Sequence, residues 1–285
     1  MPRYFQAVSL VHPFPSALNA LLVLGLALLA GGEEAFPEAA GLALAMLALQ
    51  FSIGAFNDYL DLDLDEVAKP EKPIPSGVVG HAAALRIAIA CAGVALLVAA
   101  TFGGAVLLLA LAMLAAGLVY SALLKRGPLG WACFAIAFPL LPVYAWYGAV
   151  GEMPPRAELL LPLAALAGPA LQLANGLVDL ERDRRTGVRG LPGLLGRPGS
   201  LVVLGVIQAS IHAVAWLTLL TGPSPGTPAL FAVGASGAMT LAGIVLSAAP
   251  DPDWREWGWR SQAVGIALLA VGWLAAVAAR GTLPA

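Results

Sequence analysis

The chain has 285 residues, of which 60% are hydrophobic and only 11% are charged, and its mean hydropathy is +0.85. Soluble domains carry about 25% charged residues, so this composition excludes an ordinary soluble protein and indicates an integral membrane protein embedded in a lipid bilayer. The formal net charge of −2 is nearly neutral, which argues against nucleic acid as a partner.

Nine apolar segments follow one another along the chain, and each is long enough to cross about 30 Å of hydrocarbon as a helix. They cover approximately residues 14–30, 39–56, 83–100, 104–124, 129–148, 159–177, 201–221, 229–249 and 263–279. We therefore predict an all-α, multi-pass membrane protein, with nine transmembrane helices in a single membrane domain over residues 1–285.

The distribution of Lys and Arg predicts the orientation of these helices, because loops rich in these residues stay cytoplasmic. Counted from a cytoplasmic N-terminus, two of the 15 basic residues, Arg156 and Arg280, fall outside and the other thirteen fall inside. We expect the N-terminus on the cytoplasmic side and the C-terminus on the outside.

The chain carries the skeleton Asn-x-x-x-Asp-x-x-x-Asp twice, in NDYLDLDLD at 57–65 and in NGLVDLERD at 175–183. The copies end the second and the sixth apolar segments, and segments four apart in an alternating series run in the same direction. We therefore predict a parallel pseudo-repeat with halves of about 1–128 and 129–285, and two Asp-rich motif loops on the cytoplasmic side.

Each skeleton predicts one polar helix face, because a step of four residues advances a helix by only about 40°. Asp58 lies three residues before Asp61 and can join the first face, whereas Asp63 and Glu181 point elsewhere. The two faces hold Asn57, Asp61 and Asp65 and, in the second copy, Asn175, Asp179 and Asp183.

Acidic residues at a helix end can simply be solvated, but two arguments favour a ligand site. A carboxylate inside the hydrocarbon costs about 2.5 to 3.5 kcal/mol, and like charges one turn apart repel unless a cation lies between them. Oxygen ligands without Cys or His nearby favour Mg²⁺ over zinc or copper. Facing acidic clusters can hold Mg²⁺ ions that grip a diphosphate, and the predicted metal ligands are Asn57, Asp58, Asp61, Asp65, Asp179 and Asp183.

Three motifs in order resemble those of the UbiA superfamily of intramembrane prenyltransferases. NDYLDLDLD with KPEKPIPSG at 69–77 is similar to the family's NDxxDxxxD and its downstream RPIPSG-like stretch. DLERDRRTGVRGLP at 179–192 is similar to its second Asp-rich motif, and YSALLKR at 120–126 to its tyrosine and lysine signature. The resemblance implies a UbiA-like bundle and covers nearly the whole chain.

The resemblance also implies Mg²⁺-dependent transfer of a prenyl group from an allylic polyprenyl diphosphate, with two Mg²⁺ ions bridging the diphosphate. The catalytic residues would be Asp61, Asp65, Asp179, Asp183 and Lys125. The substrate-binding residues would be Asn57, Lys69, Lys72, Tyr120, Lys125, Arg126 and Asn175. For the acceptor we expect an aromatic ring, as in quinone biosynthesis, and the alternative is a glycerol-phosphate lipid or another non-aromatic acceptor.

The chain also departs from the family pattern. Lys72 replaces the usual Arg, which keeps the charge but loses bidentate phosphate geometry. The interval between Tyr120 and the basic pair is one residue longer than in some members, so Lys125 and Arg126 compete for one role. The remaining departures are His12 for Arg, Arg182 for Gly and Gly190 for Thr.

Two other classes of membrane protein use intramembrane aspartates. A cation-coupled secondary transporter often has inverted repeats and a binding site near the midplane, whereas this repeat is parallel and lies at the cytoplasmic end. A CDP-alcohol phosphotransferase would carry a DGxxAR-containing signature, which this sequence lacks.

Four further residues are expected to be structural. His212 is expected to have a packing role or, alternatively, to line an acceptor pocket. Three tryptophans are expected to precede the last helix and to form an interfacial belt, namely Trp254, Trp257 and Trp259.

Overall fold

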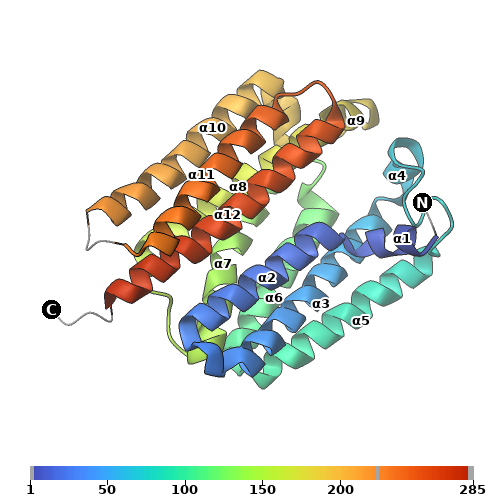
Figure 1. Ribbon diagram of the computed structural model, residues 1–285. Helices are drawn as coiled ribbons and strands as arrows, with labels where there is room; N and C mark the ends of the chain where they lie inside the picture. The colour runs from blue at the N-terminus through green and yellow to red at the C-terminus, as the bar shows by residue number, and fades with distance from the viewer. Residues whose placement is uncertain (1–2, 222–224, 282–285) are drawn as a thin grey trace. The chain divides into compact units, whose positions relative to one another are not determined.

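The computed structural model describes residues 3–221 and 225–281, and every regular element over these ranges is a helix (Figure 1). In this part of the chain nine helices are long and apolar enough to cross a membrane. Both observations confirm the predicted all-α membrane class.

One of the nine membrane helices begins much earlier than predicted. Helix α12 (Pro252–Gly281) starts about ten residues before the apolar segment inside it. The range of α10 (Leu191–Leu220) also starts before its apolar segment, but the backbone of Gly196 is not helical, with φ 67° and ψ 172°, so a short helix ends at this kink before the membrane helix begins. Polar residues end an apolar segment without ending a helix, and in α12 the pair of Glu256 and Arg260, four residues apart, is helix-compatible. The prediction that the three tryptophans precede the last helix is therefore wrong, because they lie within α12.

The described residues form two compact units. Unit 1 comprises residues 3–125 and 140–152, and unit 2 comprises residues 126–139, 153–221 and 225–281. Helix α7 (Gly130–Val150) contributes to both units. The single domain over residues 1–285 and its pseudo-repeat stay a prediction.

Unit 1 is built around the long helix α3 (Phe36–Leu60), which packs against α2, α5 and α6. Its other elements are α1 (Arg3–Val8), η1 (Ser9–Val11), α2 (Pro13–Gly31), η2 (Glu33–Ala35), α4 (Leu62–Ala68), α5 (His81–Thr101), α6 (Gly104–Val119) and the π-helical turn η3 (Tyr120–Leu124). A Cβ atom on Gly54 would lie 3.1 Å from the main-chain carbonyl carbon of Val11. The absence of a side chain at Gly54 thus lets η1 approach α3 near the first Asp-rich motif.

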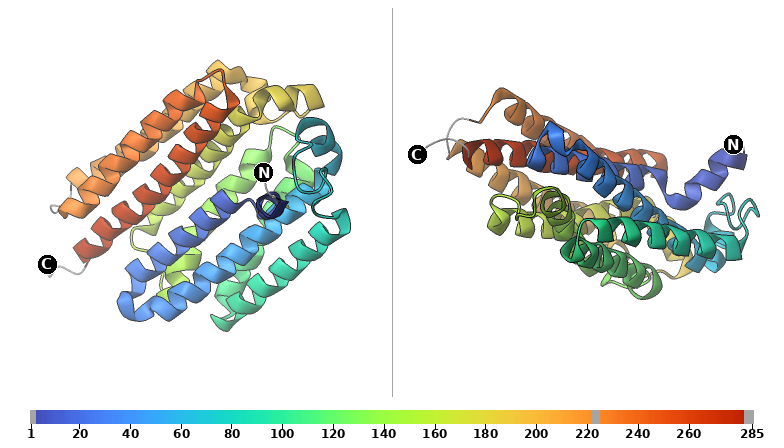
Figure 2. Two further views of the ribbon diagram at one scale, coloured as in Figure 1. Left: turned by 45° about the vertical axis from the view of Figure 1, so that its right-hand side comes forward. Right: turned by 90° about the horizontal axis from the view of Figure 1, so that it is seen from below.

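Unit 2 contains α8 (Ala157–Val178), α9 (Leu180–Thr186), α10, α11 (Thr227–Ser247) and α12. Helices α11 and α12 lie side by side (Figure 2). A Cβ atom on Gly243 would lie 2.6 Å from the carbonyl oxygen of Gly258, and one on Gly258 would lie 2.7 Å from that of Gly243. These two glycines therefore allow the main chains to touch, as small residues do in membrane helix pairs.

Candidate active site

The two Asp-rich skeletons have the same local fold. In the first, α3 ends at Leu60, Asp61 forms a junction with φ −89° and ψ 6°, and α4 follows. In the second, α8 ends at Val178, Asp179 forms the junction with φ −95° and ψ 5°, and α9 follows. The predicted motif loops are thus helix ends joined to short helices, and each junction is the middle Asp of its skeleton.

The first motif is buried on the face that the four-residue spacing predicts. Asn57, Asp61 and Asp65 expose 8% or less of their surface, and Asp58 exposes 2%. Asp63 is exposed. The main-chain hydrogen bonds from Asp61 to Asn57 and from Asp65 to Asp61 maintain the helical repeat across the junction. The predicted polar face therefore survives the break.

Lys72 neutralises part of this face from the turn that follows α4. Its ammonium group donates to Asp58 Oδ1 at 2.8 Å and to Asp65 Oδ2 at 2.7 Å. Burial lowers the pKa of Lys72, but the two carboxylates outweigh this effect and raise the pKa above its usual value. Burial raises the pKa of Asp65, and attraction to Lys72 only partly offsets the rise.

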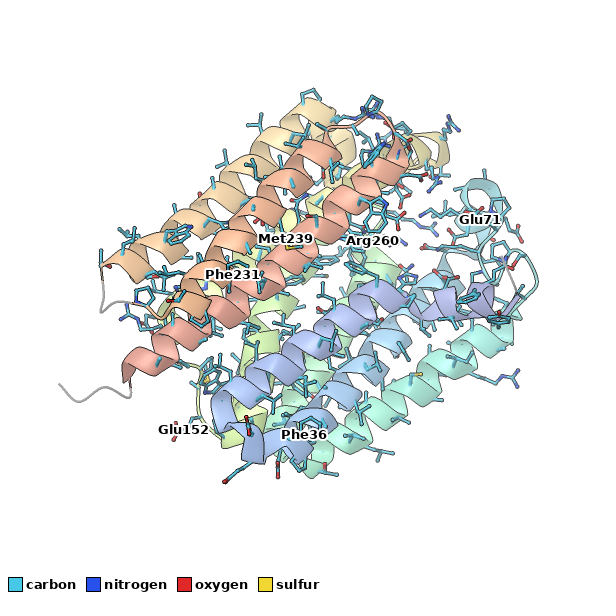
Figure 3. The ribbon with its side chains drawn as sticks, in the orientation of Figure 1. Phe36, Glu71, Glu152, Phe231, Met239 and Arg260 are labelled. Atoms are coloured by element: carbon cyan, nitrogen blue, oxygen red, sulfur yellow. The ribbon has the colours of Figure 1, made fainter. Side chains whose placement is uncertain are left out.

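The turn that carries Lys72 is attached to the N-terminal helix. The side chain of Gln6 donates to the carbonyl oxygen of Glu71 at 2.5 Å and to the hydroxyl of Ser76 at 3.0 Å. Figure 3 labels Glu71, which lies next to Lys72 in this turn. Helix α1 therefore supports the position of the lysine.

His12 lies between η1 and α2 and contacts the same motif. Its Nε2 atom lies 3.0 Å from Asp58 Oδ1. The backbone of His12 is left-handed, with φ 48°, a region that is uncommon for residues other than Gly but in which Asn, Asp and His are enriched. The sequence marked this position only as a departure from the family's usual Arg.

Lys125 is the second cation of the first motif. It donates to Asn57 Oδ1 at 2.8 Å and forms a short ion pair with Asp61. The π-helical turn η3 ends next to it, and the amide of Lys125 donates to the carbonyl of Tyr120, five residues earlier. Arg126 is exposed, whereas Lys125 makes both of these contacts.

The second motif is less buried than the first. Asn175 is exposed, and Asp179 and Asp183 are half-buried. Arg182, which replaces the family's usual Gly, donates to Asp179 Oδ1 at 3.1 Å. The polar face predicted for this copy is therefore more open than the first, and it carries an arginine that the family pattern lacks.

Glu181 points away from these aspartates, as predicted, and it contacts two arginines that sequence reasoning missed. It forms a short ion pair with Arg197 of α10, and its Oε2 atom accepts from Arg255 of α12 at 2.5 Å. Burial raises the pKa of Glu181, but the hydrogen bond from Arg255 and further contacts outweigh it and hold the pKa below its usual value.

The first motif fits a divalent cation by charge and by donor type. Three carboxylates, those of Asp58, Asp61 and Asp65, face two ammonium groups. Asp58 Oδ2 is buried without a hydrogen-bond partner, which is costly unless a ligand binds it. The atoms that these carboxylates offer to a metal are all oxygens, which Mg²⁺ prefers as ligands. Among the described residues no three His, Cys, Asp or Glu side chains already converge as a metal site.

The remaining predicted substrate-binding residues lie at the ends of elements. Lys69 follows α4 directly, and Tyr120 begins η3. Both are half-buried. Their roles, and those of the aspartates, stay predictions.

Comparison with known proteins identifies the family. The model of the UbiA prenyltransferase family matches residues 18–258. Digeranylgeranylglyceryl phosphate synthase of Methanopyrus kandleri is 30% identical over 247 residues, which are 86% of this chain and 90% of that protein. The protein of the same name from Halobacterium salinarum is 31% identical over 217 residues, which are 75% of this chain and 78% of that protein.

A solved structure shows the same fold. A UbiA homologue from Archaeoglobus fulgidus, bound to DMAPP and Mg²⁺, has a TM-score of 0.71 at 19% identity, with 92% of this chain and 98% of that chain covered. With the family match, this favours an enzyme over the transporter alternative. The chain belongs to the UbiA prenyltransferase family and is a multi-pass membrane prenyltransferase.

Proposed function

We propose that this enzyme transfers a prenyl group from an allylic polyprenyl diphosphate to a hydroxyl group of a glycerol-phosphate lipid. The observation that carries this proposal is the match to two digeranylgeranylglyceryl phosphate synthases over three quarters or more of the chain. That name describes a glyceryl phosphate with two prenyl groups. The match favours the glycerol-phosphate alternative over the aromatic ring, our first expectation from sequence.

In this proposal the aspartates hold Mg²⁺, and the Mg²⁺ bound by the Archaeoglobus homologue supports the choice of metal. The ligands would be Asp61 and Asp65 from the first motif and Asp179 and Asp183 from the second, assisted by Asn57 and Asp58. When bound, Mg²⁺ would neutralise the diphosphate and so make it a better leaving group. Two ions are expected because both motifs carry carboxylates.

The basic residues of the first motif would share the charge of the leaving diphosphate. Lys72 and Lys125 already contact the carboxylates that would bind the metal, so in this proposal their ammonium groups lie close to the diphosphate. Donors already placed where negative charge develops are effective catalysts because they need little reorganisation.

The reaction breaks the bond between the allylic carbon and the diphosphate oxygen and forms an ether bond to the acceptor. The acceptor hydroxyl attacks the allylic carbon, the diphosphate leaves with the bonding electron pair, and the hydroxyl proton passes to the departing diphosphate. Apolar side chains around the reacting carbon would exclude water, which would otherwise capture the allylic cation.

The acceptor can be identified by product analysis. Purified enzyme in nanodiscs with Mg²⁺ is given geranyl, farnesyl or geranylgeranyl diphosphate. Each donor is paired with geranylgeranylglyceryl phosphate, 4-hydroxybenzoate, homogentisate or a naphthoate, and products are analysed by mass spectrometry. We expect a prenyl ether of the glyceryl phosphate. A ring-alkylated product, with no ether formed, would overturn the proposal and support the aromatic acceptor.

A further inference from the structure

Arg255 joins three elements of unit 2 although its side chain is completely buried. Its guanidinium donates to both carboxylate oxygens of Glu181, at 3.3 and 2.5 Å. It also donates to the carbonyl oxygen of Val178 at 3.4 Å and to that of Pro250 at 3.1 Å. Val178 is the last residue of α8, so Arg255 contacts both sides of the Asp179 junction.

A second arginine binds the same carboxylate from another direction. Arg197 of α10 pairs with Glu181 Oε1. It directly follows Gly196, whose φ of 67° produces the kink in α10. Helix α9 is thus connected to both α10 and α12 through the single side chain of Glu181.

These contacts set the rotation of α9. The helix has seven residues, and helices this short are not stable on their own. Glu181 lies two residues after Asp179 and two before Asp183, so it points about 160° away from each. Anchoring Glu181 on one side therefore fixes the direction of both aspartates on the other.

Stability alone is a weak explanation for these contacts. Burying a charged pair often gives no net stabilisation compared with apolar residues of similar volume, and Nε of Arg255 remains buried without a partner. The groups that surround metal ligands, in contrast, commonly tune metal affinity.

We propose that Glu181, Arg197 and Arg255 are positioning residues, which orient Asp179 and Asp183 for the metal and diphosphate. This inference rests on the metal-binding role proposed above for the two aspartates. It does not depend on the identity of the acceptor.

The test compares Glu181→Gln, Arg255→Lys and Arg255→Met with a matched control, Gln262→Met. Gln262 is also fully buried on α12, but its side chain donates to Ser247 of α11 and to the carbonyl of Gly258 rather than to α9. The control therefore perturbs the packing of α12 without removing the anchor. Because the side chain of Glu181 is 41% exposed, the Glu181→Gln variant keeps the test informative if Arg255→Met does not fold.

Two measurements test the inference without requiring turnover of the prenyl-transfer reaction. Hydrogen–deuterium exchange of the metal-free protein reports the order of residues 179–190. Calorimetric titration with Mg²⁺, in the presence of the unreactive probe farnesyl thiolodiphosphate and without acceptor, reports metal affinity.

We expect Glu181→Gln and Arg255→Met to speed exchange in this segment and to weaken Mg²⁺ binding by about 10- to 100-fold. Arg255→Lys should restore part of the loss, and Gln262→Met should change neither readout. Unchanged Mg²⁺ affinity in Glu181→Gln would overturn the inference, even if exchange became faster. Failure of the wild-type protein to bind Mg²⁺ with the probe would instead count against the proposed function.

Discussion

Lys125 donates to the side-chain oxygen of Asn57 at 2.8 Å although the two residues are 68 positions apart in the chain. The contact connects the end of η3 to the first Asp-rich motif. It also distinguishes Lys125 from Arg126, which competed with it for the same role in the sequence. The geometry favours Lys125 as the residue that assists the diphosphate.

Lys125→Met should reduce turnover by about 100-fold or more, because one donor aimed at developing charge contributes about this much. Arg126→Met is the matched control, since it removes the neighbouring cation, which is exposed. It should leave turnover near the wild-type value. Turnover is measured as diphosphate release with saturating donor. Equal losses in the two variants would contradict the assignment.

The π-helical turn explains why the interval from Tyr120 to Lys125 can be one residue longer than in some family members. A π-helical turn accommodates one extra residue within an α-helix, so the helix on either side keeps its direction. Deleting Leu123, which is 74% exposed, should therefore restore a regular α-helical turn and keep Lys125 on the motif.

The control for this deletion is the removal of both Ala122 and Leu123. The turn contains only one extra residue, so the loss of a second residue shortens the helix itself and should rotate Lys125 by about 100° around the helix axis. Turnover should survive the single deletion and be lost in the double one. If the single deletion lowers turnover as much as the double deletion, the π-helical turn does not simply accommodate one extra residue.

Much of the fold follows from the sequence because apolar length and four-residue spacing are local properties. The burial of Asp61 and Asp65 and the exposure of Asp63 agree with the predicted helix face. The break at Asp61 was not predictable from spacing, because the hydrogen-bond repeat continues through it.

The arginine partners of Glu181 could not be predicted, because they come from other parts of the chain. Arg255 lies 74 residues from Glu181, and the sequence shows only that both are charged. The early start of α12 hides this link, since Arg255 precedes the apolar segment expected at about 263. The role of a buried arginine at the start of a membrane helix can be recognised only when its ion-pair partner is known.

The aspartates of the two skeletons should be essential and Asp63 should not be. We expect Asp61→Asn, Asp65→Asn, Asp179→Asn and Asp183→Asn each to reduce turnover by at least about 100-fold, because each removes a metal-binding charge. Asp63→Asn should have a small effect, since that side chain is exposed. Folding is checked by detergent gel filtration. If the Asp63 variant were as inactive as Asp61→Asn, the one-face assignment would be wrong.

Metal removal gives an independent test of the same site. Excess EDTA should abolish turnover of the wild-type enzyme, and added Mg²⁺ should restore it. The chelator acts on the metal and not on the fold, so the thermal unfolding midpoint of the ligand-free protein should change little. Full activity in EDTA would exclude a role for the metal.

The predicted orientation can be tested with reporters fused to the chain ends. A reporter that is active only in the cytoplasm should work at the N-terminus and fail at the C-terminus, because thirteen of the 15 basic residues fall on the cytoplasmic side in this orientation. A reporter active only outside should give the opposite pattern. A C-terminus found in the cytoplasm would overturn the orientation or the number of crossings.

The anchor of α9 should weaken in acid, and the direction follows from the pKa of Glu181. This pKa lies below its usual value of 4.5, because the contacts led by Arg255 outweigh the opposing effect of burial. A lowered pKa contributes stability that is fully present above the usual value and is lost as the pH falls through the lower, folded-state pKa. Protonated Glu181 resembles glutamine, which also lacks the charge. The wild-type protein should therefore unfold at a higher temperature than Glu181→Gln above pH 4.5, and the two midpoints should converge on further acidification.

Glu158→Gln is the control, because the side chain of Glu158 is 66% exposed in its pair with Arg156 and this variant should differ little from the wild type at any pH. A gap between wild type and Glu181→Gln that widens in acid would contradict the ion-paired state of Glu181.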